Sequence, residues 1–273
     1  MSRMPRRKGS AVVGVAVVGG VVAVLALGAC AASGTDGEGA ASASATVDSE
    51  PTTLTVFAAA SLTEAFDRLA ERFEAEHPSV EVVLSYGGSA ALAQQVVEGA
   101  PVDVFASAAG TPMQAVVDAG LAEDPIVFAT NTLELVVPKG NPAGVTGLAD
   151  LADPDLRVAL CDASVPCGAA SAELLEREGV VAAPDTLESD VKAVLTKVSL
   201  GEVDAALVYR TDVIAAGDEV EGLEVPGAAS VVNRYPVAAL ADAAHADAAA
   251  NFVSFVTGEA GRAVLAAAGF GVP

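Results

Sequence analysis

The sequence predicts an α/β fold built on a mostly parallel sheet with helices on both faces. Strand-like apolar runs alternate with amphipathic stretches from residue 53 to residue 273. The chain has 273 residues and is 52% hydrophobic, which is enough for a sizeable core. Several predicted helices begin directly behind a strand. About 220 residues of alternating strands and helices would form either one large sheet or two smaller lobes.

The first strand is predicted over residues 53–60, TLTVFAAA, and leads into a helix over 61–76. Apolar residues at helical spacing support this helix, and the proline that follows His77 stops it. Further strands are predicted over 80–87 and 102–108, with a helix over 89–99 between them.

A helix over residues 111–120 carries unusually clear start signals. Thr111 is predicted as the N-cap, Pro112 occupies the first position, and Gln114 completes a capping box. The remaining elements follow the same alternation. Strands are predicted over 131–139, 158–163, 203–209 and 231–240, and helices over 167–179, 189–201 and 245–269.

The pattern of the N-terminal residues indicates a targeting segment. Basic residues precede an apolar run of 19 residues, which ends in Leu27-Gly28-Ala29-Cys30. This ending resembles a bacterial lipobox, so residues 1–29 are predicted to be a lipoprotein signal peptide and Cys30 the lipidated residue. An uncleaved membrane anchor is the alternative. Residues 30–52 are then a flexible tether, and the folded part lies outside the cytoplasmic membrane.

The charge balance excludes two classes of partner. The net charge is −22, and without the first 29 residues it would be −26, from 10 basic and 36 acidic residues. Such a protein repels nucleic acid and lacks a basic patch for membrane surfaces. The absence of Trp and the low aromatic content also argue against a base-stacking surface.

Two cysteines remain once Cys30 is assigned to lipid. The spacing of Cys161 and Cys167 matches no common zinc pattern. In an oxidising exterior a local disulfide is the simpler interpretation, with two reduced thiols as the alternative.

The chain lacks the signatures of an enzyme, and no catalytic residue is assigned. Its two histidines, His77 and His245, are predicted to be solvated surface residues. A serine hydrolase needs a positioned histidine and usually a nucleophile elbow, which is missing around both Ser61 and Ser89. Phosphate-binding glycine loops and calcium-loop spacing are also missing, so no cofactor and no metal cation is expected.

The starts of four predicted helices are the candidate site. Ser61, Ser89, Cys167 and Val191 lie at these starts, where unpaired N–H groups and the helix dipole favour an anion. The phenol of Tyr209, at the end of a strand, adds a donor. Ser61 with Glu64 is also an ordinary capping box, so only the group of positions together indicates a ligand.

Several stretches together resemble the molybdate-binding proteins of ABC importers, which belong to the two-lobed periplasmic-type solute-binding proteins. The stretches include VFAAASLTEAF, SYGGSAALAQQVVEGAPVDVFASA and DAALVYRTD. They occur in the family's order and span about residues 53–273. The cysteine pair is a departure from the family pattern.

The resemblance implies a periplasmic-binding-protein type II fold, with two mostly parallel sheets joined by two crossover strands. Lobe I would comprise residues 53–130 and 237–273, and lobe II residues 131–236. It also implies that Ser61, Ser89, Cys167, Val191 and Tyr209 hold the oxyanion, with Cys167 and Val191 using their backbone N–H groups.

The implied function is a lipid-anchored monomer that captures molybdate, and also tungstate, and delivers it to an ABC permease and its ATPase. The alternative is a protein of the same fold for another oxyanion such as sulfate, or for a small carboxylate.

Overall fold

The computed structural model describes residues 51–273, which belong to one compact unit. The predicted signal peptide, the lipidated Cys30 and the tether lie outside the described residues. Within residues 51–273, no helix has the length and apolar character needed to cross a membrane.

The strands are hydrogen-bonded in the order β2-β1-β3-β9-β4-β7-β5-β6, and β8 pairs with β4 outside this path. Two groups are parallel, β2-β1-β3 at one end and β7-β5-β6 at the other. The bounds are β1 Thr52–Ala59, β2 Val80–Gly87, β3 Val104–Ala106, β4 Ile126–Pro138, β5 Val158–Cys161, β6 Thr186–Glu188, β7 Ala205–Tyr209, β8 Val220–Leu223 and β9 Val232–Ala239.

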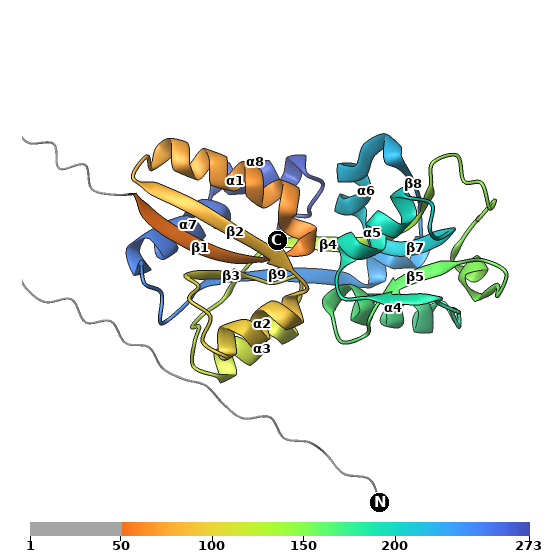
Figure 1. Cartoon of the computed structure of the whole chain (residues 1–273), viewed down its shortest axis with the longest axis horizontal. Coiled ribbons are helices and arrows are strands. Elements are labelled where there is room, and N and C mark those ends of the chain that lie inside the picture. The colour runs from red at the N-terminus through yellow and green to blue at the C-terminus, as the bar shows by residue number, and fades with distance from the viewer. Residues whose placement is uncertain (1–50) are drawn as a thin grey trace, which may run out of the picture. The chain divides into compact units, whose positions relative to one another are not determined.

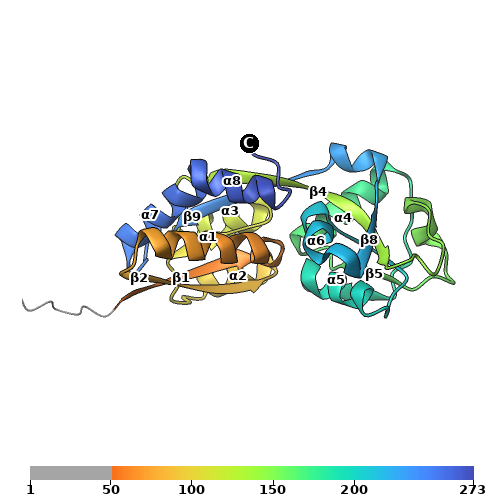
Figure 2. The ribbon, with the colours of Figure 1, turned by 90° about the horizontal axis from the view of Figure 1, so that it is seen from above.

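Two antiparallel strands connect the parallel groups. The first half of β4 pairs with β9, and its second half pairs with β7 and β8. Strand β9 in turn pairs with β3. Figures 1 and 2 show β4 passing from one group of elements to the other. The predicted α/β fold with two mostly parallel sheets and two crossover strands is therefore confirmed.

Helices cover the sheet on both faces. The α-helices are α1 Thr63–Glu76, α2 Ser89–Val97, α3 Gly110–Asp118, α4 Pro166–Arg177, α5 Val191–Ser199, α6 Arg210–Ala216, α7 Ala246–Thr257 and α8 Glu259–Ala267. Short 3-10 helices are η1 Ala60–Leu62, η2 Leu148–Ala152, η3 Gly217–Glu219 and η4 Pro226–Ser230.

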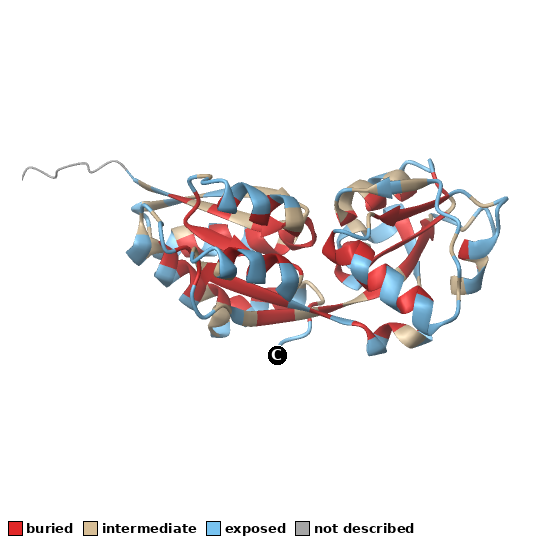
Figure 3. Cartoon of the chain, turned by 90° about the horizontal axis from the view of Figure 1, so that it is seen from below, coloured by how far each residue is buried: buried red, intermediate tan, exposed pale blue. Residues whose placement is uncertain are grey.

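Buried residues lie in both parts of the molecule (Figure 3), and the apolar ones among them form separate clusters. Helices α1, α7 and α8 pack on one face of the first strand group, and α2 and α3 pack on the other. The remaining cluster uses residues between 133 and 231 only. We call the part with the first two clusters lobe I and the part with the third lobe II. The exact boundaries at residues 130/131 and 236/237 stay a prediction.

Three of the predicted helices differ from the structure in their start or their continuity. Helix α1 begins at Thr63 rather than at Ser61, because a 3-10 turn intervenes and no side chain caps it. Helix α3 begins at Gly110, and Gln114 donates to Asp118 one turn later instead of completing a capping box. The predicted helix over 245–269 is two helices, because Gly258 takes an extended conformation between them.

The C-terminal residues are attached to the crossover strand β4. The N–H of Thr130 donates to the Gly271 carbonyl at 2.8 Å, and the N–H of Gly271 donates to the Thr130 carbonyl at 2.9 Å. Figures 1 and 2 both place the C-terminus beside β4. This short bridge ties residue 271 to the strand that joins the lobes.

Candidate functional site

A small cavity lies where the two lobes meet, at the carboxyl ends of several strands. Its volume is about 20 Å³, little more than the ~10–15 Å³ that one water molecule needs. Such a space suits a small ion. Its lining residues are Ala59, Ala60, Ser61, Gly87, Gly88, Ser89, Ala108, Val165, Pro166, Cys167, Asp190, Val191 and Tyr209.

All five residues predicted to hold the ligand line this cavity. Ser61 and Ser89 come from lobe I, and Cys167, Val191 and Tyr209 come from lobe II. The structure therefore brings together residues that are up to 148 positions apart in the sequence. Their role in binding a ligand remains a proposal, which is developed below.

The lobe I serines are held in place by hydrogen bonds to the protein. Strand β1 ends in small buried alanines, and Ser61 follows in the 3-10 turn with its Oγ 3.0 Å from the Tyr235 hydroxyl. Ser89 is the first residue of α2, and its Oγ accepts the N–H of Ala108 at 3.0 Å. The capping box expected between Ser61 and Glu64 is absent, since no side chain caps α1.

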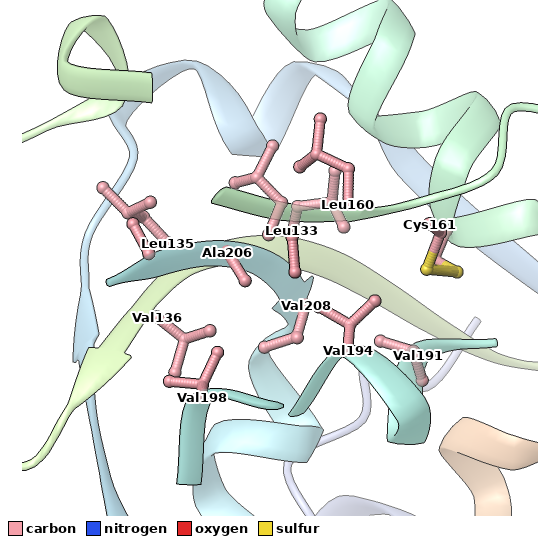
Figure 4. Packing of buried hydrophobic residues seen from close by; sticks show 14 of the residues in the cluster. Leu133, Leu135, Val136, Leu160, Cys161, Val191, Val194, Val198, Ala206 and Val208 are labelled. Carbon is pink, nitrogen blue, oxygen red and sulfur yellow. A yellow bond between two sulfur atoms is a disulfide. The ribbon is translucent and has the colours of Figure 1, made fainter. Parts of the chain in front are cut away.

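In lobe II a disulfide shapes the start of α4. Cys161, the last residue of β5, is bonded to Cys167, the second residue of α4. The next position has to be glycine, because a Cβ on Gly168 would lie 1.9 Å from the Asp162 carbonyl oxygen. Figure 4 shows Cys161 and Val191 at one edge of the lobe II core, and Val191 and Cys167 line the cavity. The disulfide interpretation matches the structure, and its stiffened loop adjoins the site.

The helix starts supply backbone donors. Ser89 and Val191 are the first residues of α2 and α5, so their N–H groups have no acceptor within their own helix. Cys167 occupies the second position of α4, where the same holds. Three helix N-termini with their positive dipole ends therefore adjoin one small space.

The cavity contains no basic side chain. Its only ionisable carboxylate belongs to Asp190, and one oxygen of that group accepts the Ala193 N–H at 3.0 Å as the N-cap of α5. Burial raises the pKa of the Tyr209 phenol well above its ordinary value. The phenol therefore stays protonated and can donate a hydrogen bond.

Three buried polar residues behind the cavity were not predicted from the sequence. They are Asn131 on β4, and Asn233 and Tyr235 on β9. Asn131 and Asn233 face one another in register across the two crossover strands. The only available signal was the two asparagines, Asn131 at the start of one predicted strand and Asn233 within another.

An ion-pair group crosses between the lobes next to the cavity. Nζ of Lys192 lies 2.8 Å from Oε1 of Glu64 on α1 and 3.1 Å from Oδ1 of the buried Asp212 on α6. Burial raises the pKa of Asp212 to about 6, although Lys192 opposes this rise. Burial alone would lower the pKa of Lys192, but the two carboxylates outweigh it and raise that pKa.

The histidines lie away from the cavity. Both are partly exposed at the surface: His77 packs its ring on Phe73 at 4.3 Å, and the His245 side chain is 40% exposed while its backbone N–H donates to Asp103. Neither lies among the lining residues. Across residues 51–273, no three His, Cys, Asp or Glu side chains are grouped as metal ligands would be.

Comparison with known proteins gives a consistent result. Residues 54–271 match the family described as bacterial extracellular solute-binding protein. A molybdate-binding protein of Mycobacterium tuberculosis is 42% identical over 221 residues, covering 81% of this chain and 85% of that protein.

Two solved structures share the fold. The periplasmic molybdate-binding protein of Azotobacter vinelandii has a TM-score of 0.70 at 23% identity, covering 81% of this chain and 99% of that one. The sulfate-binding protein SubI of Mycobacterium tuberculosis has a TM-score of 0.66 at 21% identity, covering 80% of this chain and 86% of that one. At these identities the likeness concerns the fold alone, and it does not choose between oxyanions.

Proposed function

The chain belongs to the family of bacterial extracellular solute-binding proteins, and on that premise we propose that it captures molybdate and delivers it to an ABC importer. The observation that carries this proposal is the meeting of Ser61, Ser89, Cys167, Val191 and Tyr209 around one small cavity. The 42% identical molybdate-binding protein supports the choice of ligand.

The donors around the cavity suit a tetrahedral dianion. The hydroxyls of Ser61, Ser89 and Tyr209 would bind its oxygens together with the N–H groups of Cys167 and Val191. The ion would be held as an oxyanion, with no protein ligand on the metal atom itself. Neutral donors at helix starts stabilise such an anion without a basic side chain.

The same donors favour a fully deprotonated anion. A bound X–O–H group would need an acceptor, and an unmatched buried proton is costly. Asp190 is the one carboxylate at the cavity, and it already caps α5. Tungstate would bind in the same way as molybdate, and the size of the cavity would disfavour the smaller sulfate.

Because the ligand residues are divided between the lobes, binding would shift the protein from an open to a closed arrangement. The permease would recognise the closed form. The lipobox-like ending at Cys30 supports attachment of the monomeric protein to the outer face of the cell membrane.

Calorimetric titration of the fragment 51–273 with molybdate, tungstate, sulfate and phosphate tests the proposal. We expect one-to-one binding of molybdate and tungstate and much weaker binding of sulfate and phosphate. Preferential binding of sulfate or phosphate would assign the protein to another transport system. No binding of any of the four would leave the family membership as a statement about the fold.

A further inference from the structure

We infer that Asn233, with Asn131 beside it, is a positioning residue that fixes the direction of the hydrogen bonds at the cavity, so that the protons of its three hydroxyls are left to donate to the ligand. This inference rests on the proposed oxyanion-binding function and extends it to residues outside the cavity lining. It explains how neutral hydroxyls, which can accept as well as donate, keep their protons free for the ligand.

The orientation of the Asn233 amide is set by its two neighbours. Its Nδ2 lies 3.0 Å from the Ala108 carbonyl oxygen and 2.9 Å from the Tyr209 hydroxyl. A carbonyl oxygen can only accept, so the atom facing it has to be the amide nitrogen. That nitrogen can only donate, so the Tyr209 oxygen accepts from it, and the phenolic proton is left for another acceptor.

The same amide also acts on Ser89, through one peptide group. The carbonyl of Ala108 accepts from Asn233, and the N–H of Ala108 donates to Ser89 Oγ at 3.0 Å. Ser89 Oγ therefore already accepts a hydrogen bond from the protein. Its own proton is available to the cavity that the residue lines.

The third hydroxyl, that of Ser61, is linked to Asn131 through the hydroxyl of Tyr235. The Oδ1 of Asn131 accepts the Thr132 N–H at 3.0 Å, which fixes its amide, and its Nδ2 donates to the Tyr235 hydroxyl at 3.4 Å. Tyr235 can then donate to Ser61 Oγ, 3.0 Å away. The contact at 3.4 Å is longer than an ordinary hydrogen bond, so this path directs Ser61 less firmly than Asn233 directs Tyr209.

The position of these residues makes the arrangement rigid. Asn131, Asn233 and Tyr235 are buried, and the two asparagines are register partners on β4 and β9. Burial raises the pKa of the Tyr235 phenol, so it too stays protonated. Tyr209 and Ser89 thus already accept a hydrogen bond from the protein, and Ser61 can accept one from Tyr235. An anion without protons is then the ligand to which all three hydroxyls can donate.

Asn233→Leu tests the inference in the fragment 51–273, because leucine keeps the branched shape and removes the amide. We expect the Kd for molybdate to rise at least tenfold. Asn251→Leu is the matched control, because Asn251 is exposed on α7 in lobe I. The Kd of this variant for molybdate should equal that of the parent.

A double-mutant cycle with Tyr209→Phe distinguishes an effect on the direction of the Tyr209 hydrogen bond from an effect on packing alone. If Asn233 acts through the Tyr209 hydroxyl, the loss caused by Asn233→Leu should shrink to a few-fold in the Tyr209→Phe background. A full tenfold loss in that background would overturn the inference, and so would a parental Kd for Asn233→Leu. A parent that binds no molybdate would instead refute the proposed function.

If Asn233→Leu does not fold, Asn233→Asp and the unmodified protein keep the inference testable. The aspartate has the shape of asparagine but presents only acceptors to Tyr209, so it should abolish measurable molybdate binding. Parental affinity in this variant would overturn the inference.

In the parent, tyrosine labelled with ¹³C at Cζ gives three resonances, one for each tyrosine of the chain. Molybdate should shift the Tyr209 resonance, because its hydroxyl then donates as well as accepts. The resonance of Tyr86, which hydrogen-bonds to Asp67 outside the cavity, should stay in place. An unshifted Tyr209 resonance at saturating molybdate would contradict the inference.

Discussion

Gly88 lies so close to Ser189 that a Cβ atom on it would be 2.4 Å from the Ser189 carbonyl oxygen. Gly88 precedes α2 in lobe I, and Ser189 precedes α5 in lobe II. The lobes therefore touch, backbone against backbone, at the edge of the cavity. No side chain fits at this contact.

Gly88→Ala should weaken ligand binding while leaving each lobe intact. The backbone angles of Gly88, φ −63° and ψ 127°, suit alanine, so the added methyl group acts only through the contact with lobe II. Overpacking costs about 1–3 kcal/mol, which corresponds to roughly a 5- to 150-fold rise in the Kd for molybdate. Calorimetry measures the Kd, and thermal unfolding without ligand should match the parent.

Gly110→Ala is the control for this variant, since a Cβ there would meet no atom within 4 Å. A parental Kd for Gly88→Ala would mean that the lobes bind the ligand without this close contact.

Removing a single hydroxyl from the cavity should weaken binding without unfolding the protein. Ser61→Ala and Tyr209→Phe each delete one hydrogen bond to a charged ligand, which is worth about 1.5–3 kcal/mol. Titration calorimetry with molybdate gives the loss. Tyr86→Phe is the control for the phenol, because Tyr86 bonds to Asp67 outside the cavity. Unchanged affinity in both cavity variants would place the ligand elsewhere.

Lys192→Met should destabilise the fold strongly. Lys192 is the cation beside the fully buried carboxylate of Asp212, and breaking a buried pair costs about 3–5 kcal/mol. Urea unfolding measures the difference. Lys197→Met, on the same helix, is the control: Lys197 pairs with Glu202 and Glu188 at 3.4 and 3.6 Å near the surface, and its loss should cost under ~1 kcal/mol. Equal losses for the two variants would contradict a special role for the Asp212 pair.

Asp212 should make the stability of the unliganded protein depend on pH. Its pKa is raised from 3.8 to about 6 in the folded state, with Lys192 and Glu64 as the charged neighbours. The folded state then binds the proton more tightly, so this contribution to the unfolding free energy falls as the pH rises from about 4 to about 6. A shift of this size corresponds to about 3 kcal/mol.

Urea unfolding of the parent and of Asp212→Asn between pH 4 and pH 8 checks this sign. Stability of the variant relative to the parent should grow from about pH 4 to about pH 6 and then level off. A constant difference would show that Asp212 keeps an ordinary pKa.

The cysteines of the folded fragment should resist alkylation until they are reduced. The bond between Cys161 and Cys167 closes a very short loop, for which the chain-entropy model gives about 2 kcal/mol of stability. Mass spectrometry after iodoacetamide treatment, with and without reductant, counts the free thiols, and urea unfolding measures the loss on reduction. Prompt labelling of the native protein would exclude the bond.

Much of the architecture was predictable because its signals are local. Helical spacing of apolar residues identified α1, and apolar runs bounded by turns located β1, β2 and β7 within a few residues. The start of α1 was misplaced because a 3-10 turn and the first turn of an α-helix share the same sequence signals. The Thr111–Gln114 pattern predicted a capping box, but the helix begins one residue earlier.

The residues of the candidate site also fall into those that local patterns predict and those that they do not. Its five cavity residues follow from motifs at helix starts and from the family resemblance. The register pairing of Asn131 with Asn233 and the approach of Lys192 to Glu64 join segments about 100 residues or more apart. Such pairings depend on how the crossover strands and lobes meet, which no local pattern contains.

The bridge between Gly271 and Thr130 has a practical consequence for anyone who handles the protein. Residue 271 is hydrogen-bonded to the crossover strand β4, so a purification handle fused after Pro273 begins two residues from that bond. If such a fusion hinders the proposed closure of the lobes, the measured affinity for the ligand falls. An N-terminal handle avoids this effect. The same proximity makes position 273 a good attachment point for a dye whose emission follows closure.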